Sequence, residues 1–321
     1  MKFIFGLACF VTTGSNSGRA GVEIALFVFL PIMIVMLTFM RLLEARGILE
    51  WVVRRIAPFF LPFGITGLGV FALIQGLFVS AAAPIATMAM MNNNGVSRRH
   101  IAATLAMVFG SAQANVTFPM SALGLQGLPT ILISAIAGLL GAAVTYYGFA
   151  RHLPERELLS EPLPGHPSAQ DAKGLMTVIS AAGREAFNIS INAIPMLVLA
   201  LLLVNVLRAV GLMGVLENAL APLFLALDLP ASAMLPAVTK YIAGGTAMMG
   251  VAMDSIEQGV LTIAEFNRLA GFLINPMDVA GVAIMTTAGS RVSEVMKPAI
   301  YGGLVAIAIR SVVHYWWFAP A

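Results

Sequence analysis

Long apolar runs that contain few charges constrain the fold of this chain more than any other feature of its sequence. Eight runs lie at 21–43, 61–91, 101–123, 129–150, 188–207, 231–253, 269–288 and 298–317. A helix of about 20 apolar residues crosses a bilayer core of about 30 Å. Charged residues make up only 10% of the 321 residues, which is too few to cover a water-facing surface. We therefore predict an all-α polytopic membrane protein.

The composition and motifs argue against several classes of function. The sequence has no Walker loop, no G-x-S-x-G motif and no H-E-x-x-H motif, so we predict that the chain is not an enzyme. Its single cysteine, Cys9, rules out a multi-cysteine metal site. The formal net charge of +3 reports membrane topology and not a nucleic-acid partner. We expect the lipid bilayer and a small polar solute as partners and no cofactor, with a coupling proton or Na⁺ and a homo-oligomer left open.

A polar, Pro-rich segment at 151–184 separates the apolar runs into two halves of similar length. Its composition predicts a linker, which we place on the cytoplasmic side. The chain then consists of an N-terminal segment (1–20), a first unit (21–150), the linker and a second unit (185–321). The N-terminal segment has a short apolar run without an A-x-A-like cleavage site, so we expect it to stay attached.

The two units resemble each other when one is shifted onto the other by 164 residues. The pairs that carry the match are Pro and Gly positions, which coincide by chance less often than Leu or Ala. They are Pro31 with Pro195, Gly47 with Gly211, Pro58 with Pro222, and Gly95 with Gly259. An internal duplication follows as the simplest interpretation.

The distribution of basic residues predicts that the second unit is inverted relative to the first. If 61–91 enters and leaves the membrane on one side, each unit has three transmembrane helices, and twelve basic residues lie inside against five outside, with Lys240 in the membrane. The outside set is Lys2, Arg19, Arg208, Arg268 and Arg310. If 61–91 and 231–253 both cross fully, the count is ten against seven. The inverted arrangement separates the charges better.

Glycine and proline predict a break inside one apolar segment of each unit. The segment 61–91 carries Ser80-Ala-Ala-Ala-Pro84 near its centre, and 231–253 carries Gly244-Gly245-Thr246. Proline removes a backbone donor and glycine weakens a helix, so we predict a broken or re-entrant helical hairpin in each unit. One long tilted helix with packing glycines is the alternative.

Polar residues interrupt the following span of each unit, at GSAQANVTFP (110–119) and INPMDVAG (274–281). Lys240 and Asp278 are ionisable residues inside apolar runs, where a functional role is the first hypothesis. An ion pair between them that only neutralises charge is the alternative, as interhelical hydrogen bonding is for the neutral residues. The predicted substrate-binding residues are Gln75, Ser80, Ser111, Gln113, Asn115, Thr117, Thr239, Lys240, Thr246, Asn275 and Asp278.

Two mixed polar and apolar segments, 47–58 and 211–222, each end in Ala-Pro and read as amphipathic interfacial helices. Three segments carry a resemblance to a known family, namely GILEWVVRRIAPFFLPFGI (47–65), GLMGVLENALAPLFLALDL (211–229) and Asn275–Thr287. In these segments the chain resembles the Gate or nucleoside recognition family. That family includes spore maturation protein A and B-like proteins, and related domains occur in ferrous-iron transporter B and in concentrative nucleoside transporters. The resemblance implies a transporter-like fold with one Gate-like unit per half.

The leading functional hypothesis is a secondary transporter of a small polar solute, such as a nucleoside or nucleobase, with its site at the midplane between the two units. A divalent metal or ion pathway is the first alternative, with Asn115, Asn275 and Asp278 as oxygen ligands and some Met residues as sulfur ligands. A membrane scaffold without transport activity is the second. We expect the chain in a bacterial inner membrane, as a multi-pass protein.

Overall fold

The computed structural model describes residues 14–15, 17–154, 174–209, 211–212, 222, 224 and 230–319. Every regular element among them is a helix, which confirms the predicted all-α class. Five helices are long and apolar enough to cross a membrane, namely Ser17–Ala45, Arg98–Ala122, Gly127–Phe149, Leu175–Leu207 and Met296–Trp317. The chain is an integral, multi-pass membrane protein.

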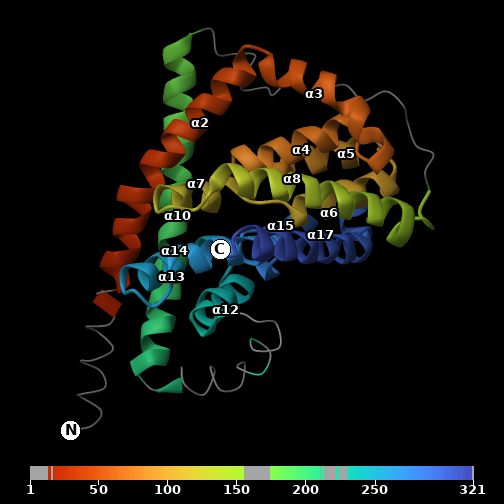
Figure 1. Cartoon of the computed structure of the whole chain (residues 1–321). Helices are drawn as coiled ribbons and strands as arrows, with labels where there is room; N and C mark the ends of the chain where they lie inside the picture. The colour runs from red at the N-terminus through yellow and green to blue at the C-terminus, as the bar shows by residue number, and fades with distance from the viewer. Residues whose placement is uncertain are drawn as a thin grey trace.

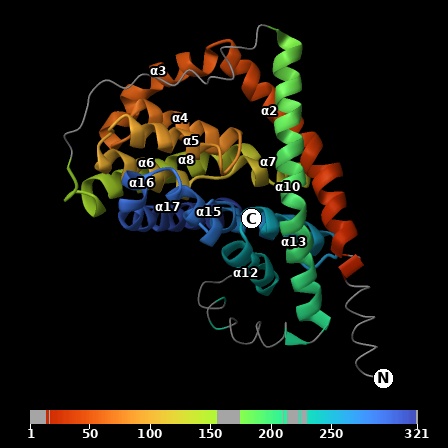
Figure 2. The ribbon, with the colours of Figure 1, turned by 180° about the vertical axis from the view of Figure 1, so that it is seen from behind.

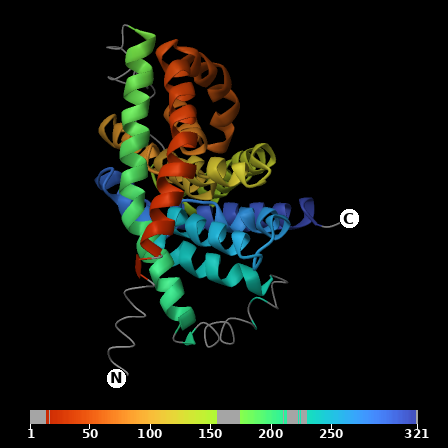
Figure 3. The same cartoon turned by 90° about the vertical axis from the view of Figure 1, so that its left-hand side faces the viewer.

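Two long helices lie side by side at one side of the molecule (Figures 1 and 3). α2 (Leu30–Ala45) continues the π-helical η1 (Ile24–Phe29), and α10 (Leu175–Ala209) packs alongside both (Figures 1 and 3). Their outer faces expose large apolar side chains such as Phe39 and Leu199, as lipid-facing helices do. We call η1 and α2, together with α10, the helix pair.

α10 begins at Leu175, inside the segment 151–184 that the sequence predicted as a linker. That boundary is wrong, because the prolines of the segment end at Pro167 and the residues after Gly174 favour a helix. The remaining linker residues 155–173 lie outside the described part of the chain, as do 1–13 of the N-terminal segment and 213–221 of the second amphipathic helix.

Each predicted break gives two short helices packed against each other. Hairpin 1 consists of α4 (Gly67–Phe78), a turn at 79–83 and α5 (Pro84–Asn93). Hairpin 2 consists of α12 (Met234–Ala243), Gly244 and α13 (Gly245–Glu257). Pro84 occupies the first position of α5, where its missing N–H costs nothing. Gly244 has φ 91°, a conformation that L side chains rarely adopt.

The polar span of each unit is also discontinuous. α6 (Arg98–Gly110) and α7 (Ala114–Ala122) are separated by Ser111–Gln113, and α14 (Ile263–Leu273) and α15 (Val279–Thr286) by 274–278. We call these pairs broken helix 1 and broken helix 2. Both breaks are buried inside protein, which is the condition for non-helical backbone at membrane depth.

The remaining helices pack with the hairpins and the broken helices into a stack beside the helix pair (Figure 2). α17 (Met296–Trp317) packs against α6, α8 (Gly127–Val144) and α14. Gly302 and Ala306 of α17 approach Gly141 of α8 so closely that a side chain on Gly141 would overlap them. The predicted amphipathic segment 47–58 forms α3 (Ile48–Phe60), with Leu49 and Val53 buried and Trp51 exposed. The short helix η3 (Thr145–Phe149) follows α8, and the short helix α16 (Ser290–Glu294) precedes α17.

Helices and turns recur at the 164-residue register. Gly47 and Gly211 have φ of 68° and 73°, and Gly95 and Gly259 both have φ of 70°. The two hairpins are interrupted at corresponding positions of the sequence, and so are the two broken helices. The two units therefore share their local backbone plan, while the inversion of one against the other stays a prediction.

Candidate functional site

A cavity of about 480 Å³ lies where the two hairpins and the two broken helices meet the helix pair. Its wall is made of residues from each of the four breaks, together with side chains from η1 and α10. The residues from the breaks are Ser80, Ala81, Ala82, Gln113, Asn115, Ala243, Gly244, Gly245, Thr246, Pro276, Asp278, Ala280, Gly281 and Ile284.

Four helix N-termini open onto this cavity. α5, α7, α13 and α15 all begin at or within a few residues of the wall. The first N–H groups of a helix have no partner within it, and they carry a partial positive charge. The ends of α5, α7 and α13 therefore suit oxygen acceptors of a solute, whereas the end of α15 is capped by Asp278.

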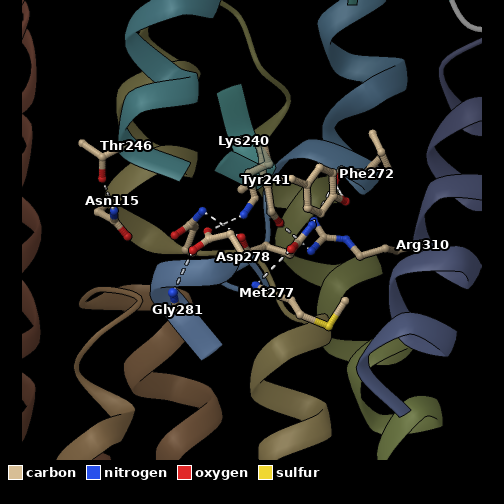
Figure 4. Close-up of polar contacts among 12 residues, drawn as sticks. Asn115, Lys240, Tyr241, Thr246, Phe272, Met277, Asp278, Gly281 and Arg310 are labelled. Carbon is tan, nitrogen blue, oxygen red and sulfur yellow. Dashed lines mark hydrogen bonds and ion pairs between the residues drawn. The ribbon is translucent and has the colours of Figure 1, made fainter. Parts of the chain in front are cut away.

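Asp278 joins the cavity wall to a buried ion pair (Figure 4). Its Oδ2 accepts from Lys240 Nζ at 2.5 Å, and its Oδ1 accepts from the backbone N–H of Gly281 at 2.8 Å, which caps α15. Lys240 lies in hairpin 2 and is fully buried, and it does not line the cavity. The pair is thus neutral, and only its carboxylate side faces the solute space.

Asn115 of broken helix 1 connects the tips of both hairpins. Its Oδ1 accepts from the backbone N–H of Ala81 at 3.1 Å. Its Nδ2 donates to Thr246 Oγ1 at 3.2 Å, as Figure 4 shows. Gln113, two residues earlier, donates from Nε2 to the backbone carbonyl of Asn275 at 3.0 Å. The bonds to Thr246 and Asn275 tie the first unit to the second beside the cavity.

The helix pair supplies the remaining wall. Phe29 of η1 and Ile189, Asn192 and Met196 of α10 line the cavity, and their chemistry is mainly apolar. A second cavity of about 520 Å³ shares Ser80, Ala82, Ile189 and Asn192 with the first and extends to Arg184 and Glu185. The shared residues make the two spaces neighbours along α10.

The predicted site residues fall into two groups. Ser80, Gln113, Asn115, Thr246 and Asp278 line the cavity. The other six do not line this cavity, and their side chains form hydrogen bonds within the protein. Gln75 accepts from Thr87 at 2.6 Å, Ser111 donates to Met107, Thr117 to Gln113, Thr239 to Leu235, Lys240 to Asp278, and Asn275 to Phe272.

Sequence reasoning missed Arg310. It was counted among basic residues outside the membrane, but it lies fully buried in the middle of α17, so that count is wrong by this residue. Its place inside the apolar run 298–317 was the signal that could have found it. Phe29 was also missed, because nothing in its segment sets it apart. Asn192 was missed too, although a polar residue within the apolar run 188–207 was a signal that could have found it.

The described residues contain no group of three or more His, Cys, Asp or Glu side chains that could hold a metal ion.

The first unit corresponds to a known domain. Residues 26–143 match the family described as Gate, nucleoside recognition. The Gate domain thus covers η1 through α8, which includes hairpin 1 and broken helix 1. No curated protein sequence matches the chain.

The fold as a whole is similar to solved structures of CNTnw. A double variant of CNTnw in an outward-facing state matches with TM-score 0.65 and 14% identity, covering 98% of this chain and 87% of that chain. CNTnw in an inward-facing substrate-bound state matches with TM-score 0.66 and 14% identity, covering 98% and 86%. A variant in an intermediate state matches with TM-score 0.65 over 100% and 87%, again at 14% identity. The chain beyond its Gate domain therefore follows the same fold.

Proposed function

We propose that this chain is a secondary transporter of nucleosides, which binds its solute in the cavity between the hairpins and the helix pair. The observation that carries the proposal is the cavity itself, ringed by four helix N-termini at the breaks of both units. Discontinuous helices whose ends meet near the midplane are a recurring substrate site in secondary transporters. We place the protein in a bacterial inner membrane.

The chemistry of the wall supports a neutral solute that is rich in oxygen acceptors and donors. Lys240 and Asp278 neutralise each other, so no unpaired charge of this pair is offered to the solute. Asp278 and the amides of Gln113 and Asn115 suit hydroxyl groups, while Phe29 and Met196 suit a flat apolar face. A nucleoside presents both surfaces, with a hydroxylated sugar at one end and a base at the other.

Two comparisons support the same function. The Gate domain is described as a nucleoside recognition domain. CNTnw, a concentrative nucleoside transporter, shares the fold and has been solved in outward-facing, intermediate and inward-facing substrate-bound states. By analogy, we propose that the hairpins and broken helices move as a body against the helix pair and so expose the cavity alternately to each side.

The alternatives have less support. A scaffold without transport would have no need for a cavity at the breaks, and the described residues enclose one of about 480 Å³ with polar side chains from the breaks in its wall. A metal pathway would have to rely on Asp278 as the carboxylate of the cavity wall, and that carboxylate already binds Lys240 and Gly281. Neither alternative is favoured by a specific observation.

Counterflow in proteoliposomes tests the proposal. Vesicles preloaded with unlabelled uridine or adenosine should accumulate the labelled nucleoside, and uridine monophosphate should compete poorly because the site is neutral. Asp278→Asn should lower the initial rate about tenfold or more, because the carboxylate faces the solute. Glu50→Gln on the exposed face of α3 is the matched control. Absence of counterflow for every nucleoside and nucleobase tested would refute the proposal.

A further inference from the structure

Arg310 binds the ends of both broken helices at once. Its Nη1 donates to the backbone carbonyl of Gly110, the last residue of α6, at 3.1 Å, and to that of Ile274, next to the end of α14, at 2.6 Å. Its Nη2 lies 3.4 Å from the carbonyl of Ala270. Figure 4 shows the side chain reaching from α17 toward the unwound segment before Asp278.

These carbonyls are the C-terminal ends of the half-helices that precede each break. A helix C-terminus carries about half a negative charge on its unpaired carbonyls. Two such ends together balance one full positive charge, which is the charge of Arg310. Among the described residues, the buried charged side chains are Lys240, Asp278 and Arg310, so the guanidinium has no carboxylate left to pair with.

Lys240 occupies a comparable position on the other side of the break. Its ammonium group lies in hairpin 2 against Asp278, the last residue of the break 274–278. The C-terminal ends of α6 and α14 therefore bind one cation of the chain, Arg310, and the carboxylate that follows the second break binds another, Lys240.

Unwound carbonyls, half-helix C-termini and nearby carboxylates are the groups with which secondary transporters hold a coupling Na⁺ or H⁺. Resting on the proposed transport function, we propose that Lys240 and Arg310 are fixed cations that take the place of a coupling Na⁺. Nucleoside transport by this chain then needs no Na⁺ gradient.

The packing around Arg310 keeps the guanidinium in place. Gly271 of α14 faces the backbone of Arg310 so closely that a methyl group there would lie 2.5 Å from the carbonyl oxygen of Arg310. The next residues of α17 also bind α14, since His314 Nδ1 lies 2.9 Å from the carbonyl of Asn267. α17 and α14 are thus locked together along the stretch that holds the fixed cation.

The first test measures counterflow of uridine at constant ionic strength with Na⁺ or choline on both sides. The initial rates should agree within about twofold. A rate that rises saturably with Na⁺, or that vanishes in choline, would overturn the inference while leaving the transport function standing. No counterflow in either salt would refute the transport function, and the second test then still decides whether Na⁺ binds.

The second test needs no transport. The thermal unfolding midpoint of the purified wild-type protein should be the same in Na⁺, K⁺ and choline, because a cation that bound the native state alone would raise it. Arg310→Ala and Lys240→Ala should lower the midpoint, whereas Lys297→Ala, at an exposed position of α17, should leave it unchanged. A Na⁺-specific rise in the wild-type midpoint would contradict the proposal directly.

A third arm asks whether the fixed cations can be replaced by a mobile one. In Arg310→Ala, the carbonyls of Gly110, Ala270 and Ile274 lose their cation. Addition of Na⁺ or guanidinium at millimolar concentration should then raise the midpoint of the variant more than that of the wild type. An equal response of both proteins would mean that Arg310 fills no cation site.

Discussion

At the scale of single residues, the buried charges are balanced locally. A charged side chain in the bilayer centre costs about 2.5–3.5 kcal/mol on insertion scales, so it persists only with a compensating partner. Lys240 has the Asp278 carboxylate, and Arg310 has the carbonyls of Gly110, Ala270 and Ile274. All of these partners lie at or next to a helix break, so the buried charges among the described residues lie close to the cavity.

The ion pair gives a stability prediction. Lys240→Met should destabilise the protein by about 3 kcal/mol, because it leaves a buried carboxylate without its cation. The double variant Lys240→Met with Asp278→Asn should recover a large part of that loss, since neither charge remains. Unfolding in detergent, followed by tryptophan fluorescence, measures both.

The exposed pair between Arg54 and Glu50 on α3 is the control for this prediction. Arg54→Met should cost less than about 1 kcal/mol, because solvent screens the pair. A double variant that is as unstable as Lys240→Met alone would show that the lysine acts through packing and not through charge.

Asn115 gives a prediction about the coupling of the two hairpins. Asn115→Ala removes the bonds to Ala81 and Thr246, so both tips should become mobile and nucleoside affinity should fall about tenfold. Hydrogen exchange should increase at 79–83 and at 244–246. Unchanged exchange at both tips would exclude a connecting role for this side chain.

Residue chemistry was predictable from the sequence where a polar group interrupts an apolar run. Lys240 and Asp278 were identified in this way, and the structure pairs them. Arg310 also interrupts such a run, but it was counted among the basic residues outside the membrane. Its partners are backbone carbonyls freed by two breaks far away in sequence, and a pattern of side chains does not reveal them.

At the scale of elements, the sequence predicted where the helices break, but not how the two halves of each broken segment pack. Gly244 and Pro84 predict that a helix stops or starts, because of their backbone properties. Whether the two halves continue across the membrane or pack on each other depends on tertiary contacts. Gln113 illustrates this, because it meets the backbone of Asn275 only after both units have assembled.

Gly245 gives the element-scale prediction. A methyl group on Gly245 would overlap the amide of Gln113, so Gly245→Ala should push hairpin 2 away from broken helix 1. Such overpacking costs about 1–3 kcal/mol, and the initial counterflow rate should fall at least fivefold. Gly183→Ala in α10 is the matched control, because nothing lies within 4 Å of the position that its methyl group would take. A wild-type rate for Gly245→Ala would contradict the close packing of hairpin 2 on Gln113.

At the scale of the whole molecule, the helix pair lies beside a stack formed by the other helices, and the cavity lies where the two parts meet (Figures 1 and 3). The sequence predicted two related units but not this division, because α2 and α10 come from different units. The contact between them is formed by side chains from both halves, including the bond from Arg41 Nη2 to Glu185 Oε2 at 2.7 Å.

The inverted orientation of the two units is tested by labelling from one side. Asn93 and Glu257 are exposed, end α5 and α13, and correspond at the 164-residue register. In a background without Cys9, Asn93→Cys and Glu257→Cys should react with a membrane-impermeant maleimide from opposite sides of oriented vesicles. Labelling of both from the same side would exclude inverted units.

The central claim is that a neutral nucleoside binds in the cavity between the hairpins and the helix pair. Equilibrium binding of tritiated uridine and adenosine to the purified protein, measured by scintillation proximity, tests it most directly. The account predicts saturable binding that is unchanged by Glu50→Gln, weakened about tenfold or more by Thr246→Val and Asp278→Asn, and independent of Na⁺. Binding that survives both cavity substitutions unchanged would contradict it.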